Sequence, residues 1–155
     1  MITDLLATFS GTSTGSGITG QTVTGTSVAV LGTSSYDLGV ARDIGKGEPM
    51  NIAFEVVTAA SGGTSVQFQY VQADDAALST NLEVLGETDA IPVASLTAGT
   101  QIVLPVPRVE PRNARRYVGV QYNLAGAVAA GAYFAAMVHD VSDKQQSYAS
   151  GFSVL

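Results

Sequence analysis

Apolar and polar residues alternate with a period of two through much of this chain, and this pattern restricts its fold more than any other feature. The alternating segments are residues 51–56, 65–70, 101–106, 117–124 and 133–140. Successive side chains of a strand point to opposite faces, so the pattern is typical of strands with one buried face. No long stretch has the apolar spacing of a helix, although one helical turn could form within residues 74–85. The sequence therefore predicts an all-β fold.

Breaks rich in glycine or proline separate these segments. They fall at residues 45–49, 61–63, 98–99 and 105–107 and at Pro111. Short strands separated in this way predict an antiparallel β-sandwich of jelly-roll type, with a small closed barrel as the alternative. The chain has 155 residues and is most simply one domain, with the sandwich core expected at residues 28–141.

Two flanking segments differ from this core. In residues 11–27, fourteen of the seventeen residues are Gly, Ser or Thr, which buries too little apolar surface to order a segment. We therefore expect a flexible N-terminal arm unless a neighbour pins it. The polar C-terminal tail, residues 142–155, carries Tyr148 and Phe152. These two aromatic anchors could occupy pockets of a neighbouring subunit, or the tail could fold back on its own sheet.

Charged residues are scarce and unevenly distributed. They make up 13% of the chain, against about 25% in ordinary domains. The stretches without any charge are residues 5–36, 56–73, 90–107 and 117–138. A surface without ions loses little hydration when a partner buries it, so the composition favours a component of an assembly over a free-standing enzyme.

The same composition argues against two other classes of partner. The net charge is −6 and there is no basic stripe, so we do not expect nucleic acid binding. The uncharged stretch at residues 117–138 could span a bilayer by length, but Gly, Gln and Asn interrupt it, and two strands joined at a Gly-Ala turn are expected instead. No export is predicted, because Asp4 stands where a signal peptide would carry a basic residue.

Motifs of catalytic chemistry lack the context that they need. Residues 15–20 match Gly-x-Gly-x-x-Gly and residues 11–15 match Gly-x-Ser-x-Gly, but neither match lies between a strand and a helix. The single histidine, His139, adjoins Asp140, and neighbouring side chains of a strand point to opposite faces. We expect no catalytic residues and no enzyme activity.

Metal ligands are also scarce. With no cysteine and one histidine, the chain lacks the usual ligands of zinc. Asp74, Asp75 and Asn81 could hold a hard cation, but the spacing of a calcium loop is absent and a solvated turn is the expected interpretation. We therefore expect neither a metal nor a cofactor.

Two clusters hold most of the arginine, at residues 42–48 and 108–116. Arginine pairs bidentately with carboxylates, so such loops suit docking onto an acidic protein surface. Alternatively, Asp43 and Glu48 could pair with Arg115 or Arg116 within the chain, which we expect for at least one arginine. The candidate interface residues are Arg42, Asp43, Lys46, Glu48, Arg108, Arg112, Arg115 and Arg116, with Tyr148 and Phe152 of the tail.

The first cluster carries a family resemblance. Residues 36–49, YDLGVARDIGKGEP, resemble the DLG-x-ARDIG-x-GEP stretch of the capsid cement (decoration) proteins of tailed bacteriophages, the family typified by the Bordetella podophage cement protein. Residues 115–118, 90–93 and 96–99 also resemble that family in their order along the chain. The resemblance implies a jelly-roll-like sandwich that binds the outside of an icosahedral shell and stabilises it, without catalytic residues.

From this resemblance we expect a protein of the virion, made in the host cytoplasm and placed on the capsid exterior. Its partners would be the major capsid protein of the same phage and further copies of itself, with a dimer favoured over a trimer. The alternative is a carbohydrate- or receptor-binding β-sandwich of a phage fibre. That alternative requires a groove with exposed aromatic residues, whereas the chain has no Trp and its Tyr and Phe mostly occupy alternating core positions.

Overall fold

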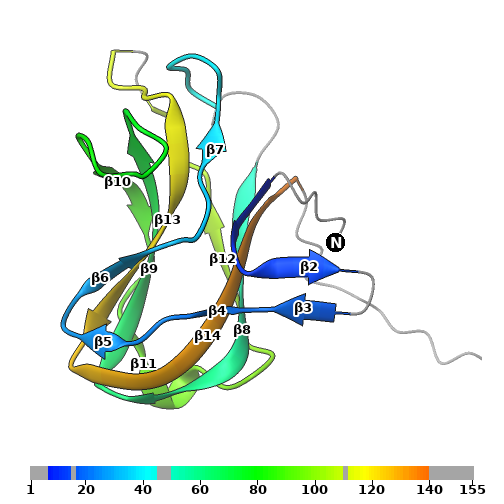
Figure 1. Cartoon of the computed structure of the whole chain (residues 1–155), viewed down its shortest axis with the longest axis vertical. Coiled ribbons are helices and arrows are strands. Elements are labelled where there is room, and N and C mark those ends of the chain that lie inside the picture. Colours follow the sequence, from blue (N-terminus) through cyan, green and yellow to red (C-terminus); the bar gives the residue numbers. More distant parts are fainter. Residues whose placement is uncertain (1–6, 15–16, 45–49, 110–111, 140–155) are drawn as a thin grey trace, which may run out of the picture.

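The computed structural model describes residues 7–14, 17–44, 50–109 and 112–139, which form two antiparallel sheets packed face to face (Figure 1). Sheet 1 has the order β1 (Thr8–Ser10), β14 (Ala127–Val138), β8 (Asn51–Gly62) and β12 (Gln101–Pro105). Sheet 2 has the order β10 (Glu83–Glu87), β9 (Ser65–Ala73), β13 (Tyr117–Ala125) and β6 (Ala29–Leu31). Shorter strands extend them: β4 (Gln21–Thr22) and β5 (Gly25–Thr26) on β14, β11 (Ile91–Pro92) on β9 and β7 (Tyr36–Asp37) on β13.

The main strands pair in a nested order. Strand β1 pairs with β14, β6 with β13, β8 with β12, and β9 with β10. Among these eight strands, the first in the sequence thus pairs with the last, the second with the second last, and so on to the two in the middle. Successive pairs alternate between sheet 1 and sheet 2. A long antiparallel ribbon rolled up in this way is a jelly roll, which confirms the predicted fold class.

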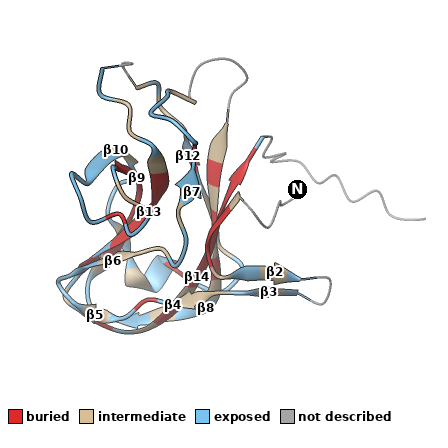
Figure 2. Ribbon diagram, turned by 45° about the horizontal axis from the view of Figure 1, so that its top comes forward, coloured by how far each residue is buried: buried red, intermediate tan, exposed pale blue. Residues whose placement is uncertain are grey.

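The core lies between the two sheets, where the alternating segments place their apolar side chains (Figure 2). Aromatic rings from both sheets meet there, with centroids 5.1 Å apart for Phe54 and Phe68 and 5.2 Å apart for Tyr122 and Tyr133. Ring pairs at these separations stabilise a core beyond the area that they bury. The aromatic residues at alternating positions therefore join the two sheets.

A loop also covers part of the outer face of sheet 2. Leu78, in the turn after β9, is buried against Val71 and Ala73. It also lies over Gly119, where an added Cβ would come within 2.5 Å of the Leu78 side chain. The helical turn expected near this position is a turn in which the Leu78 N–H donates to the Asp75 carbonyl at 3.0 Å.

Residues 20–27 belong to the sandwich, which corrects the expectation of a flexible arm for this part of residues 11–27. Strands β2 (Thr12–Thr14) and β3 (Gly17–Thr19) form a hairpin that projects from sheet 1 (Figure 1). Strands β4 and β5 then pair with β14, and Val23 between them is fully buried. The neighbour that pins this segment is β14 of the same chain. Its order comes mainly from backbone hydrogen bonds, which composition does not reveal.

The boundaries of the core shift accordingly. The sandwich was expected to begin at residue 28, but β1, β4 and β5 lie before it. Strands β13 and β14 meet at Gly126, at the Gly-Ala turn predicted from the sequence. In the part of the chain that the structure describes, no helix is long and apolar enough to cross a membrane. The tail at residues 142–155, with Tyr148 and Phe152, lies outside the described residues, as do Lys46 and Glu48.

Candidate interaction site

The two ends of the jelly roll differ in charge. One end, at the top of Figure 1, is formed by residues 37–44, 74–83, 106–109 and 112–116, and we call it the charged end. It holds every described arginine: Arg42, Arg108, Arg112, Arg115 and Arg116. At the opposite end, residues 62–64, 93–96 and 125–127 carry no charge. The fold therefore collects onto one end two arginine clusters that are far apart in sequence.

Arg116 and Asp37 form a bidentate ion pair that ties β13 to β7. The Nε and Nη2 atoms of Arg116 donate to Oδ1 and Oδ2 of Asp37, both at 2.7 Å. The carboxylate also accepts the backbone N–H of Gly39 at 2.7 Å. The hydrogen bond from Arg116, followed by that from Gly39, lowers the pKa of Asp37 to about 2. The same carboxylate raises the pKa of Arg116, whose guanidinium lies 5.2 Å from the centre of the Tyr117 ring.

Arg115 pairs with the loop that follows β9. Its Nη1 atom donates to both carboxylate oxygens of Asp74 at 2.9 Å, and its Nε atom lies 3.8 Å from Oε2 of Glu83. The Nδ2 group of Asn81 donates to Asp74 at 2.7 Å. The hydrogen bonds from Asn81 and then Arg115 lower the pKa of Asp74. Internal pairing was expected for at least one arginine, with Asp43 or Glu48 as the carboxylate. Arg115 and Arg116 do form internal pairs, but their carboxylates are Asp74 and Asp37.

Hydrogen bonds within the chain also occupy the residues considered as a cation site, Asp74, Asp75 and Asn81. Oδ1 of Asp75 accepts the backbone N–H groups of Ser79 and Thr80 at 2.9 and 2.6 Å. These hydrogen bonds lower the pKa of Asp75, and the bond from Thr80 has the largest effect. The carboxylates therefore close a turn by internal hydrogen bonds. Within the described ranges, no group of three His, Cys, Asp or Glu side chains is placed to hold a metal ion.

A buried glutamine that the sequence reasoning missed holds the arginine-rich loop in place. Gln72 of β9 donates from Nε2 to the Asn113 carbonyl at 2.8 Å and to Glu83 at 2.9 Å. Its Oε1 atom accepts the backbone N–H of Arg115 at 3.1 Å. The sequence feature that could have indicated this role is a polar residue between Val71 and Ala73, in a strand that is buried on both faces.

The two predicted clusters also meet directly. Oδ1 of Asp43 accepts the backbone N–H of Val109 at 3.1 Å, although the two residues are far apart in sequence. Asp43 thus joins the loop after β7 to the loop before β13. The structure brings the two arginine clusters together, as a shared docking surface requires.

Three arginines of the charged end remain exposed to solvent: Arg42, Arg108 and Arg112. Among the described residues, no hydrogen bond or ion pair engages their side chains. Arg115 and Arg116 form internal ion pairs, so within the described part of the chain Arg42, Arg108 and Arg112 are the arginines available to a partner. An exposed arginine without a carboxylate is a ready bidentate donor.

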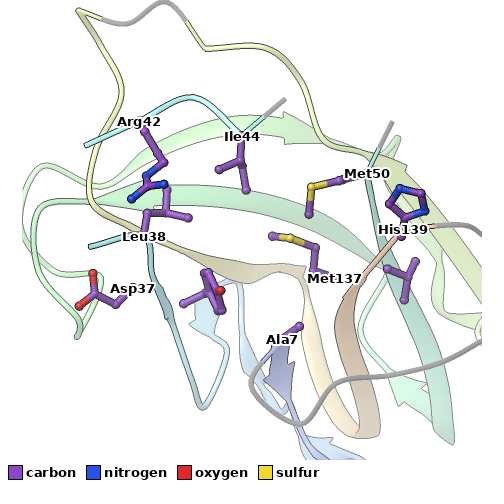
Figure 3. A pocket seen from close by; sticks show the side chains of 10 residues that line it. Ala7, Asp37, Leu38, Arg42, Ile44, Met50, Met137 and His139 are labelled. Atoms are coloured by element: carbon purple, nitrogen blue, oxygen red, sulfur yellow. The ribbon is translucent and has the colours of Figure 1, made fainter. Parts of the chain in front are cut away.

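A pocket of about 560 Å³ adjoins Arg42 (Figure 3). Its apolar lining includes Leu38, Ile44, Met50 and Met137, with Arg42 and His139 to either side of the methionines in this view. His139, directly after β14, is exposed. An apolar floor beside an arginine can hold an apolar side chain whose neighbour is a carboxylate.

Aromatic residues are nearly all inside the core. Of the described aromatic side chains, Tyr36 alone is exposed and Tyr117 is half-buried. Sugar-binding grooves usually present aromatic faces to their ligand. The described surface therefore lacks the row of exposed rings that a carbohydrate-binding module requires.

Its fold places this chain among the jelly-roll β-sandwich proteins. A profile of the Bbp16 family matches residues 18–138, which covers most of the chain, and the chain belongs to that family. The family name indicates a Bordetella phage protein, so the predicted relation to a phage family is confirmed at that level. A search of curated proteins gave no match.

Proposed function

We propose that this chain is a structural protein of a phage virion that binds the outer surface of the icosahedral capsid and cements adjacent major capsid subunits. One observation carries the proposal: the charged end presents Arg42, Arg108 and Arg112 exposed and without a partner among the described residues, on a chain with a net charge of −6. On an acidic protein, unpaired arginines gathered on one side favour docking at a defined acidic site over general attraction. Membership of a phage family supports this reading.

The loops that carry these arginines are held before any partner binds. Asp43 joins the two arginine clusters, and Gln72 fastens residues 113–115 to sheet 2. A surface ordered in advance loses less conformational entropy on binding, so more of the contact energy appears as affinity. The charged end is therefore suited to set the register of docking, while uncharged strand faces are cheap to bury against neighbouring subunits.

Cementing needs no chemical step. A protein that binds only the assembled shell stabilises that state by mass action. Each further capsid contact made by the same molecule then forms at a high effective concentration. The proposed function is accordingly a non-catalytic one that uses no cofactor.

The proposal is tested by binding of the purified chain to capsids of the phage that encodes it, stripped of this protein. We expect the triple variant R42Q/R108Q/R112Q to bind at least about tenfold more weakly, a loss of about 1.4 kcal/mol. The matched control R42K/R108K/R112K keeps the charge but not the planar fork, and should bind with intermediate affinity. Unchanged affinity of the glutamine variant would exclude the charged end as the docking surface.

A further inference from the structure

The pocket beside Arg42 has an apolar floor that is continuous with the core (Figure 3). Leu38 and Met137 belong to the core cluster, and Ile44 and Met50 pack against it while they remain half-buried. An apolar side chain that enters the pocket therefore extends the core and releases water from these residues. Methionine side chains adapt to ligands of different shape, which suits a floor built around two of them.

The lining of the pocket carries a positive charge that no described residue compensates. The carboxylate of Asp37, which also lines the pocket, is neutralised by Arg116 through two hydrogen bonds of 2.7 Å. Among the described residues, no hydrogen bond or ion pair engages the side chain of Arg42. Its Nη2 atom is 3.8 Å from the position that a Cβ on Gly39 would take, which places the guanidinium beside the loop that walls the pocket. A carboxylate of a ligand can therefore pair with Arg42 without displacing an internal partner.

Backbone hydrogen bonds hold two walls of the pocket before any ligand binds. The Leu38 N–H donates to the Arg116 carbonyl at 2.9 Å, and the Met50 carbonyl accepts the Val106 N–H at 2.9 Å. A binding site that is ordered in advance loses less conformational entropy when its ligand arrives.

We propose that this pocket binds a peptide segment in which a bulky apolar residue is flanked by an aspartate or glutamate. The apolar side chain rests on Leu38, Met50 and Met137, and the carboxylate accepts a bidentate pair of hydrogen bonds from Arg42. This inference rests on the proposed function, because the major capsid protein is the partner that supplies the segment.

Charge and the nature of the lining favour such a segment. A chain with a net charge of −6 does not attract an acidic peptide in general, so the peptide binds where an arginine lacks a carboxylate. An apolar anchor seated in a pocket is the kind of residue that contributes most to affinity at protein interfaces. The pocket adjoins the charged end, so one docking event can engage both. Residues 140–155 of this chain are the competing occupant, which the experiment below distinguishes.

Filling the pocket tests the site. Ala7 lines it and is half-buried, so A7F places a ring in the space that the apolar side chain of the partner takes. We expect A7F to bind capsids stripped of this protein at least about tenfold more weakly than the wild type. The matched control A94F adds the same ring to an exposed alanine at the opposite end and should bind like the wild type. A thermal midpoint of A7F close to that of the wild type shows that the loss is not due to unfolding, and unchanged binding of A7F overturns the proposal.

A double variant tests whether one segment makes both contacts. In the A7F background, R42Q should cost little further affinity, because the displaced segment no longer brings its carboxylate to Arg42. In the A94F background, R42Q should cost as much as it does in the wild type. An equal cost of R42Q in both backgrounds would mean that Arg42 binds a carboxylate unrelated to the pocket, and overturns the proposal.

A photoreactive residue identifies the occupant. Tyr36 lines the pocket and is 37% exposed, so p-benzoylphenylalanine in place of Tyr36 reacts with whatever enters. After irradiation on capsids, mass spectrometry should find a capsid peptide with a bulky apolar residue flanked by an acidic one, and A7F should abolish this product. Reaction with residues 140–155 of this chain instead overturns the proposal. Binding to capsids without any product at this position also overturns it but leaves the capsid role intact, whereas a wild-type chain that does not bind stripped capsids contradicts the capsid role itself.

Discussion

Two neighbouring arginines, Arg115 and Arg116, have a different task from the other three of the charged end. They neutralise Asp74 and Asp37 and thereby tie loops of the same molecule together. Arg42, Arg108 and Arg112 are exposed and have no hydrogen bond or ion pair among the described residues. Sequence reasoning identified all five residues but could not sort them, because their carboxylate partners depend on which strands the fold places side by side.

The Asp37–Arg116 pair should make the folding stability decrease at acid pH. The pKa of Asp37 is lowered from 3.8 to about 2 in the folded chain, so its contribution is complete above about pH 4 and is lost as the pH falls towards 2. Asp74 and Asp75 shift in the same direction and add to the loss. Thermal midpoints measured across this range should fall less steeply for D37N than for the wild type.

That comparison has a clear negative outcome. D37N cannot ionise, so it should also be the less stable of the two at neutral pH, where the wild-type pair is intact. If the thermal midpoints of D37N and the wild type change in parallel from neutral pH down to pH 2, the ion pair contributes nothing to the pH dependence of folding.

Secondary-structure elements were predictable where one face of a strand is buried. The alternation at residues 51–56 and 101–106 reappears as β8 and β12. Prediction failed at residues 20–27 because backbone pairing of β4 and β5 with β14 places a segment that has few apolar side chains. It also missed the burial of Gly119 on the outer face of β13, because the covering Leu78 belongs to another loop.

The turns that pass the chain between the two sheets give a prediction at this scale. Gly62, at the end of β8, has φ of +70°, and a Cβ there would lie 2.6 Å from the Ala127 carbonyl oxygen. Gly99 has φ of +86° and nothing within 4 Å. A left-handed conformation costs a side chain about 1–2 kcal/mol at either position. We expect G99A to lose about that much stability, and G62A to lose distinctly more because the overlap is with backbone.

Chemical denaturation of the two variants measures the difference. Gly99 is the matched control, since both substitutions add one methyl group at a positive φ. Equal losses for G62A and G99A would mean that the turn between β8 and β9 adjusts without cost, contrary to the close packing of Gly62 against the start of β14.

At the scale of the whole molecule, two features coincide: long uncharged stretches of chain, and one end that gathers every described arginine. The sequence indicated the first from its uncharged stretches and located both arginine clusters. It could not show that the clusters share one end, because this follows from the nested pairing of the jelly roll. The proposed capsid role uses both features, since uncharged faces are cheap to bury and arginines can set the docking register.

The copy number of this chain in purified virions tests the capsid role most directly. Quantitative mass spectrometry would compare it with the major capsid protein of the same particles. A cement protein occupies sites repeated over the whole shell, so we predict a copy number of the same order as that of the capsid protein. Absence from virions, or a few copies confined to the tail, would contradict the proposed function.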